Sequence, residues 1–338
     1  MDLNIVWFLL IAVLFTGYII LDGFDFGVGI LSLFAKSQDE RRIYINAIGP
    51  VWDGNEVWLL TGGGALFAAF PFVYATVFSG FYLAIMLLLL ALIARAVSME
   101  FRGKVEGDGW RKVWDLCFGI GSLLPAVLFG VAFGNILRGL PLSENFVFEG
   151  NFLGLLNPYA ILVGLLSLAA FTMHGAAYMM LKSDGELYSR MQGWVNKGWI
   201  ATVLLYVIAT IASILTSPFL FEGITGNPLF WLMLILLIGS LFYTPFAAKA
   251  GKAGMTFLST SVMLASMLGI AAVSLFPMLV PSTIDLGLSM DIYNSSSTER
   301  TLWTMFIIAL IGMPLVIGYT IFIYRIFKGK VEITPESY

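Results

Sequence analysis

Charged residues are scarce in this sequence. Of its 338 residues only 12% are charged while 59% are hydrophobic, and the mean hydropathy is +0.91. A soluble domain of this length would carry about twice that share of charge. Apolar runs of about twenty residues recur, long enough to cross a hydrocarbon core roughly 30 Å thick. The ~10-residue alternating segments of a transmembrane β-barrel are absent. The sequence therefore predicts an all-α, polytopic integral membrane protein.

Cysteine and histidine are almost absent. The one cysteine, Cys117, excludes a disulfide within the chain and an all-cysteine iron–sulfur or zinc site. The one histidine, His174, excludes a bis-histidine haem; a His/Met site is conceivable, but a lone helical histidine is more often hydrogen-bonded packing. No phosphate loop, nucleotide fingerprint or nucleophilic triad can be assembled, and a basic surface domain is lacking. We expect no catalytic, cofactor-binding or metal-ligating residue in this chain, and no nucleic-acid partner.

Nine apolar segments are long enough to span a membrane. They cover residues 4–34, 48–70, 74–99, 114–137, 157–181, 198–216, 228–248, 255–280 and 302–327. Turn signals such as Asn157-Pro158 and Asn227-Pro228 separate them. The first segment lacks the basic region of a cleaved signal peptide, so we expect it to be a helix of the protein. Since no connection is long enough for a soluble domain, residues 1–338 are predicted to form one transmembrane domain.

Lysine and arginine fall mainly on one side of this topology. Of the 18 basic residues, only Arg138 and Arg300 lie on one side, and the other 16 lie on the opposite side or just inside it. Cytoplasmic loops carry the excess of Lys and Arg. The distribution predicts an outside N-terminus and a cytoplasmic C-terminus.

Four acidic residues stand in the first two spans. Asp22 and Asp25 are three positions apart, as are Asp53 and Glu56, so each pair shares a helix face. The first span runs inward and the second outward, which places all four carboxyls in the cytoplasmic half of the membrane. An ionised Asp in a membrane helix costs roughly 2.5–3.5 kcal/mol on insertion scales. We expect Asp25 and Asp53 to relay protons, whereas Asp22 and Glu56 have the alternative of sitting wet at the headgroup boundary.

Arg95 lies at the inner end of the third predicted span. It is the natural counter-ion for the four carboxyls, and equally it could extend to the membrane surface. Small residues accompany the acidic ones: Gly23 and Gly27 are four apart, and the run 62–64 is all glycine. Such residues let membrane helices approach closely, so we expect tight packing around the carboxyls.

These residues alone leave two functions open. One is a proton-handling subunit of a larger machine, and the other is a small ion-coupled transporter with a buried acidic cluster. Midplane helix breaks and an inverted repeat would favour the transporter. Here the acidic cluster lies off-centre, and no convincing repeat is seen.

Several blocks of the sequence closely resemble subunit II of the cytochrome bd quinol oxidases. They are LDGFDFGVGIL at 21–31, ERRIYINAIGPVWDGNEVWLLTGGGALFAAFPFVYATVFSGFY at 40–82, WDLCFGIGSLLPAVLFGVAFGN at 114–135, FPMLVPS at 276–282, NSSSTERTLWTM at 294–305 and MPLVIGYTIFIYRIFKGK at 313–330. The WDGN motif with its downstream GGALFAA is highly specific. About 140–260 matches only loosely.

The resemblance implies two four-helix bundles plus a peripheral helix, in a bacterial cytoplasmic membrane. It implies a haem-free chain paired with subunit I, which holds two haems b and one haem d, and a complex that oxidises quinol and reduces oxygen to water. The residues of the family's proton route match Asp25 and Asp53. Glu56 occupies a position that the family can fill with a neutral amide. A small single-helix third subunit, bound lipid and bound quinone are left open.

Overall fold

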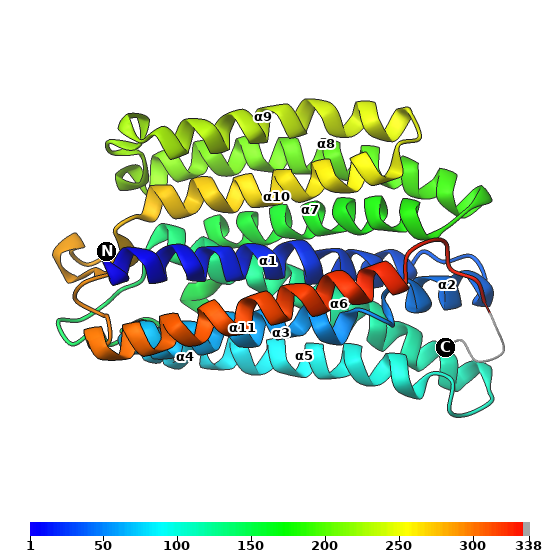
Figure 1. The fold of residues 1–338 in the computed structure, drawn as a ribbon, viewed down its shortest axis with the longest axis horizontal. Helices are drawn as coiled ribbons and strands as arrows, with labels where there is room; N and C mark the ends of the chain where they lie inside the picture. The colour runs from blue at the N-terminus through cyan, green and yellow to red at the C-terminus, as the bar shows by residue number, and fades with distance from the viewer. Residues whose placement is uncertain (334–338) are drawn as a thin grey trace.

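Long helices lie side by side along one direction and make up most of the molecule (Figure 1). The computed structural model describes residues 1–333. The long helices are α1 (Leu3–Ser32), α3 (Trp52–Ala69), α5 (Tyr82–Phe101), α6 (Asp108–Arg138), α7 (Pro158–Lys182), α8 (Gly185–Thr216), α9 (Pro228–Lys249), α10 (Ala253–Leu275) and α11 (Glu299–Ile326). Shorter elements connect them: helices α2 (Gln38–Ile48) and α4 (Pro71–Gly80), the 3-10 turns η1 (Leu153–Leu156), η2 (Pro218–Phe221), η3 (Ile224–Gly226) and η4 (Leu286–Leu288), and strands β1 (Met278–Val280) and β2 (Met290–Asp291).

The number of membrane spans agrees with the prediction. Among the described residues, eight helices are long and apolar enough to cross a membrane, and α3 with α4 counts as a ninth, bent by 120° at the break between them. The predicted span 74–99 is not continuous, because Phe81 separates α4 from α5. Helical hydrogen bonds still cross this break, from Phe81 N–H to Val77 O and from Ile85 N–H to Phe81 O.

The structure differs from the predicted boundaries at α8 and α10, and it contains one short helix that was not predicted. Helix α8 begins at Gly185 rather than 198, since its first three turns are polar and give no hydropathy signal although they are helical. Helix α10 ends at Leu275 rather than 280, because the chain turns into β1, which pairs antiparallel with β2 in the register Met278 to Asp291. Helix α2, with a polar sequence, was not predicted.

Two of the predicted turns act as helix caps. The side chain of Asn157 accepts a hydrogen bond from the Ala160 N–H at 2.9 Å, and Pro158 fills the first position of α7. The side chain of Asn227 accepts from the Leu229 N–H at 3.0 Å, and Pro228 begins α9. The asparagine side chain satisfies a backbone N–H group that has no partner in the first turn of a helix. Proline at the first helical position has no N–H group, so it leaves none unpaired. Both helices start where the sequence indicates.

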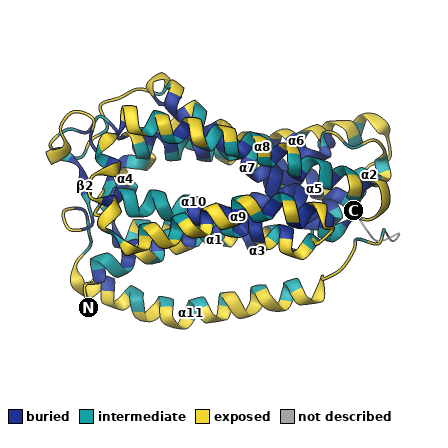
Figure 2. Cartoon of the chain, turned by 90° about the horizontal axis from the view of Figure 1, so that it is seen from above, coloured by how far each residue is buried: buried dark blue, intermediate teal, exposed yellow. Residues whose placement is uncertain are grey.

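The helices form two four-helix bundles with one helix outside them. Bundle A comprises α1, α3, α5 and α6, and bundle B comprises α7 to α10. Helices α1 and α6 pack on α7, and α1 also packs on α10, so α1 belongs to the seam between the bundles. Helix α11 runs alongside with few contacts, to α3 and α1 (Figure 2). The predicted architecture is confirmed.

Glycine brings α1 and α7 into backbone contact. A Cβ on Gly27 would lie 2.0 Å from the Phe171 carbonyl oxygen and 2.8 Å from Gly175 Cα, so neither glycine can be enlarged without moving a helix. By contrast, a Cβ on Gly63 or Gly64 would meet no atom within 4 Å. Close packing was correctly expected in α1, but this chain offers no such contact at Gly63 and Gly64.

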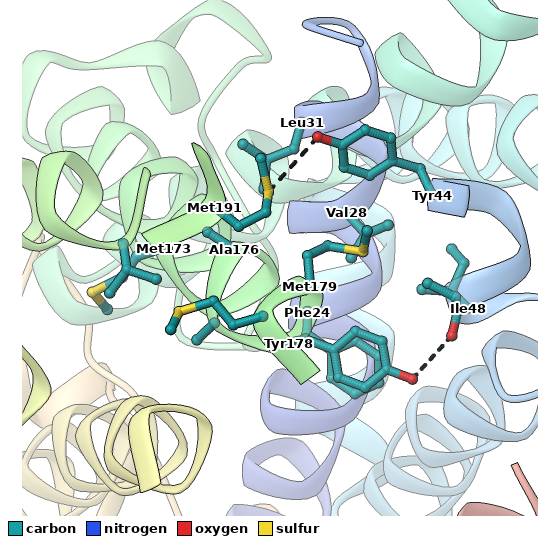
Figure 3. Packing of buried hydrophobic residues seen from close by; sticks show 14 of the residues in the cluster. Phe24, Val28, Leu31, Tyr44, Ile48, Met173, Ala176, Tyr178, Met179 and Met191 are labelled. Carbon is teal, nitrogen blue, oxygen red and sulfur yellow. Dashed lines mark hydrogen bonds between the residues drawn. The ribbon is translucent and has the colours of Figure 1, made fainter. Parts of the chain in front are cut away.

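A methionine- and aromatic-rich core fills the seam toward the end of the molecule where α2 lies. Phe24 of α1 stacks on Tyr178 of α7, with ring centroids 3.9 Å apart (Figure 3). The Tyr178 hydroxyl donates to the Ala47 carbonyl of α2 at 3.0 Å, which fixes that short helix against the bundle. Phe24, which precedes Asp25 in α1, belongs to this core, so apolar side chains lie on one side of that carboxyl.

Candidate functional site

The acidic residues of α1 and α3 meet the arginine of α5 inside bundle A. We use the term buried charge cluster for Asp22 and Asp25 of α1, Asn55 and Glu56 of α3, and Arg95 of α5. Three helices supply these five side chains, and four of the five are no more than 1% exposed. Glu56 is the exception, with 20% of its side chain exposed.

Arg95 holds the cluster together. Its Nη2 lies 2.8 Å from Asp22 Oδ1 and 2.5 Å from Glu56 Oε1, so one nitrogen serves both carboxylates. The guanidinium carbon also lies 4.4 Å from the centre of the Phe26 ring, a cation–π contact. Because the Arg95 side chain is fully buried, it does not extend to the surface of this chain, and its geometry is that of a counter-ion.

Asp22 is not exposed to solvent on the surface of this chain. Its side chain is completely buried within the chain, one helical turn after Tyr18. The alternative reading of the sequence, a solvated headgroup position, is therefore wrong for Asp22. It fits Glu56 better, since that carboxyl is partly exposed.

Asp25 points to a different partner from Asp22. Its Oδ2 accepts a hydrogen bond from Asn55 Nδ2 at 2.7 Å, and the same Nδ2 reaches the Leu21 carbonyl at 3.2 Å. The Asn55 Oδ1 in turn accepts from the Tyr324 hydroxyl at 3.0 Å. The sequence analysis assigned no role to Asn55, although this residue is part of the WDGN motif. It assigned no role to Tyr324 either. Tyr324 lies 269 positions away, and no local pattern links the two.

Asp53 lies apart from the buried charge cluster. It occupies the first turn of α3, exposed on the surface of this chain. Since Glu56 follows three positions later, the two carboxyls share a helix face. Asp53 is exposed and Glu56 partly exposed on this face of α3, and Glu56 contacts the fully buried Arg95 of α5, which in turn contacts Asp22 of α1.

Several buried polar atoms of the site have no hydrogen-bond partner among the described residues. They are Asp22 Oδ2, Asp25 Oδ1, Arg95 Nε, Arg95 Nη1 and the Tyr18 hydroxyl oxygen. Buried polar groups in native proteins almost always find a partner, in the protein or in ordered water. These atoms give the cluster free donors and acceptors, which hydrogen-bonded water requires.

His174 lies outside this cluster and is hydrogen-bonded through both ring nitrogens. Its Nδ1 lies 2.7 Å from Thr260 Oγ1, and its Nε2 lies 3.0 Å from the Ile20 carbonyl oxygen. The ring also stacks on Phe257, with centroids 4.7 Å apart. Both ring nitrogens therefore have hydrogen-bond partners, which agrees with the interpretation of this lone helical histidine as hydrogen-bonded packing. Among residues 1–333, no cluster of three or more His, Cys, Asp and Glu has the arrangement of a metal site.

Comparison with known proteins gives one consistent family. The family described as cytochrome bd terminal oxidase subunit II matches residues 3–327. A probable cytochrome oxidase subunit 2 from Haemophilus influenzae is 36% identical, over 98% of this chain and 95% of its own length. A cytochrome bd ubiquinol oxidase subunit 2 from Bacillus subtilis is 38% identical, over 98% of this chain and 97% of its own length.

Similarity in three dimensions extends over nearly the whole chain. A solved structure of the bd oxidase from Geobacillus thermodenitrificans contains a chain that matches with a TM-score of 0.80 at 18% identity, covering 97% of this chain and 99% of that one. At that identity the match establishes the fold alone. The family match over residues 3–327, together with relatives aligned over almost their full length, settles the classification: this multi-pass membrane protein belongs to the cytochrome bd terminal oxidase subunit II family.

Proposed function

We propose that this chain is the haem-free subunit II of a bacterial quinol:oxygen oxidoreductase in the cytoplasmic membrane. The support is the family itself and relatives named as ubiquinol oxidase subunits. The haems, two of b type and one of d type, reside in the partner subunit I, where they supply the electron transfer and oxygen reduction. In this chain the single histidine has both nitrogens occupied, which agrees with a supporting role rather than a haem-binding one.

The second part of the proposal is that the buried charge cluster carries protons from the cytoplasm toward subunit I. The observation that carries it is the gradient of exposure on α3 and α1. Asp53 is exposed, Glu56 has 20% of its side chain exposed, and Asp22 and Asp25 are fully buried. The basic residues on loops at this end predict that it faces the cytoplasm. Asp53 is then the entry group, and the deeper carboxyls receive protons from it.

The composition of the cluster suits proton exchange. The cluster holds three carboxyls and one guanidinium, which pairs with Asp22 and Glu56, so its formal charge is −2 when all three carboxyls are ionised and changes by one with each proton bound. An excess charge in a low-dielectric interior is unfavourable, and proton binding removes it. One carboxyl oxygen of Asp22 and one of Asp25 have no hydrogen-bond partner among the described residues, so each can accept a hydrogen bond from water. Intramembrane carboxyls with water are the usual elements of proton relays.

Replacement of the carboxyls by amides tests the relay. In the assembled complex with full haem content, Asp53→Asn and Asp25→Asn should each slow oxygen reduction, because an amide keeps the shape but does not carry a proton. Asp39→Asn, an exposed acid on α2, is the control and should leave the rate unchanged. Full turnover in correctly assembled Asp25→Asn and Asp53→Asn enzymes would refute the relay. Loss of assembly in Asp25→Asn would instead indicate a structural role.

The alternative function, a small ion-coupled transporter, makes different demands. An oxidase subunit purifies with a haem-bearing partner of comparable size, and a reduced-minus-oxidised spectrum of the particle shows b- and d-type haem. A transporter would purify without pigment and bind a small solute. The family match favours the oxidase. The same preparation would reveal a small third subunit, bound lipid or bound quinone.

A further inference from the structure

Hydrogen bonds fix helix α11 near both of its ends. Leu302 is the one buried residue of this helix among residues 299–326, and its main packing is on α3 and α1 (Figure 2), through partly buried apolar residues: Met305, Phe306, Ala309, Met313, Ile323 and Tyr324. At the first end, the indole N–H of Trp7 donates to the Leu302 carbonyl at 3.0 Å. At the far end, Tyr324 bonds to Asn55 in the buried charge cluster. A helix with so little packing needs such fixed points to keep a defined position.

The residues after α11 provide a second fixed point at that far end. We call 327–333 the C-terminal strap. Lys330 Nζ donates to the carbonyls of Met180 at 3.0 Å and Ser183 at 2.6 Å, and Val331 N–H donates to the Lys182 carbonyl at 2.9 Å. These carbonyls close the last turn of α7, where acceptors lack helical partners and a cation is favoured. The strap thus ties the end of α11 to bundle B.

The Tyr324 hydroxyl helps to hold the Asn55 amide with its NH2 group toward Asp25. An amide has an oxygen that only accepts and an NH2 group that only donates. Because the Tyr324 O–H donates to Asn55 Oδ1, the NH2 group is turned toward Asp25 Oδ2, where it donates at 2.7 Å. Without this bond the NH2 group still has Asp25 and the Leu21 carbonyl as acceptors, but the amide oxygen loses its partner and the side chain is held less firmly against Asp25.

We propose that Tyr324 is a positioning residue for Asp25: the C-terminal strap holds the inner end of α11 against the cluster, and Tyr324 orients Asn55 to bind the Asp25 carboxyl. The proposal deepens the proposed proton relay and rests on it, since it assigns a control on the same carboxyl. The titratable and charged groups around Asp25 are Asp22 on its own helix, Glu56 on α3, Arg95 on α5, Tyr178 on α7 and Tyr324 on α11.

Removal of one hydroxyl group tests the proposal. Tyr324→Phe in the haem-replete complex should lower oxygen-reduction turnover roughly twofold to tenfold, the range expected for one lost hydrogen bond. It should also shift the infrared carboxyl band of Asp25, identified as the band that Asp25→Asn abolishes. Tyr319→Phe makes the same change at an exposed position of α11 and should affect neither measurement.

Two further variants separate orientation from general structure. Asn55→Ala should shift the same infrared band, and the double variant Tyr324→Phe/Asn55→Ala should shift it no further than Asn55→Ala does, because both act through one amide. Lys330→Ala should produce part of the Tyr324→Phe shift by loosening the strap, whereas the exposed Lys328→Ala should not.

An unchanged Asp25 band and unchanged turnover in Tyr324→Phe would overturn the positioning role, even if Asp25→Asn slows the enzyme. Full turnover in Asp25→Asn would refute the proton relay instead. In that case a shift of the Asp25 infrared band in Tyr324→Phe would still show whether Tyr324 positions the carboxyl.

Discussion

Arg95 and Asp22 form an ion pair in which both side chains are fully buried, with Nη2 of the arginine 2.8 Å from Oδ1 of the aspartate. The two residues are 73 positions apart and come from different helices. A buried pair adds little net stability compared with apolar residues, but removal of one partner leaves an uncompensated charge. We therefore expect the stability of bundle A to depend strongly on Arg95, the counter-ion at its polar centre.

Arg95→Met should destabilise the complex by about 3–5 kcal/mol, because Asp22 and Glu56 lose their shared counter-ion. The measurement is the yield of haem-containing complex and the midpoint of its thermal loss of haem absorption. The stability of Arg95→Lys should lie between those of Arg95→Met and the wild type, since lysine keeps the positive charge but lacks the planar guanidinium group. Arg138→Met, an exposed arginine at the end of α6, is the control. Wild-type yield and midpoint in Arg95→Met would contradict the counter-ion role.

Gly27→Ala should destabilise the complex through a contact between helices rather than through charge. The new methyl carbon would lie 2.0 Å from the Phe171 carbonyl oxygen, so α1 and α7 must separate. Overpacking of this kind costs about 1–3 kcal/mol. Gly239→Ala on α9 is the matched control, since its Cβ meets no atom within 4 Å. Equal thermal midpoints for the two variants would show that the α1–α7 contact adapts without cost.

His174→Ala should lower stability without changing the haem spectrum. The substitution removes two hydrogen bonds, to Thr260 Oγ1 and to the Ile20 carbonyl, and each contributes about 0.5–1.5 kcal/mol. The reduced-minus-oxidised spectrum, normalised to the amount of complex, should equal that of the wild type. Loss of one haem band per complex would mean that His174 binds iron.

Glu40→Gln should remove a pH-dependent contribution at the end of the molecule where α2 lies. Burial acts to raise the pKa of Glu40, but hydrogen bonds from Arg190 at 2.5 Å and from the Lys36 backbone at 2.7 Å outweigh it, so the pKa lies below its ordinary value. A carboxyl with a lowered pKa stabilises the fold above its unfolded pKa and loses this effect as the pH falls through the folded one.

At neutral pH, Glu40→Gln should therefore be less stable than the wild type by up to about 1 kcal/mol, the range of such ion pairs. The difference should vanish as the pH falls below the folded pKa. Thermal midpoints measured across the acid range test this, with the exposed Glu106→Gln as control. A difference that persists at low pH would assign it to something other than the charge of Glu40.

Hydropathy and charge predicted the number of spans because each apolar helix carries its own signal. They did not predict the first turns of α8, since Glu186, Arg190 and Lys197 continue a helix beyond its apolar part. The carboxyls were recognised one by one, because each is anomalous in an apolar run. Their pairing was not predictable: Asp22 and Asp25 look equivalent in sequence, yet one bonds Arg95 and the other Asn55. That choice depends on the packing of three helices, which no local pattern encodes.

The break between α3 and α4 also has a consequence for synthesis. Helix α3, with Asp53 and Glu56 in its first half, reaches the apolarity of a span only together with α4, whereas α5 qualifies by itself. The guanidinium that neutralises Glu56 is translated 39 residues later. We expect the translocon to retain α3 until α5 emerges and to release both into lipid as a hairpin. On this account α3 enters the membrane only after Arg95, the counter-ion of Glu56, has been synthesised.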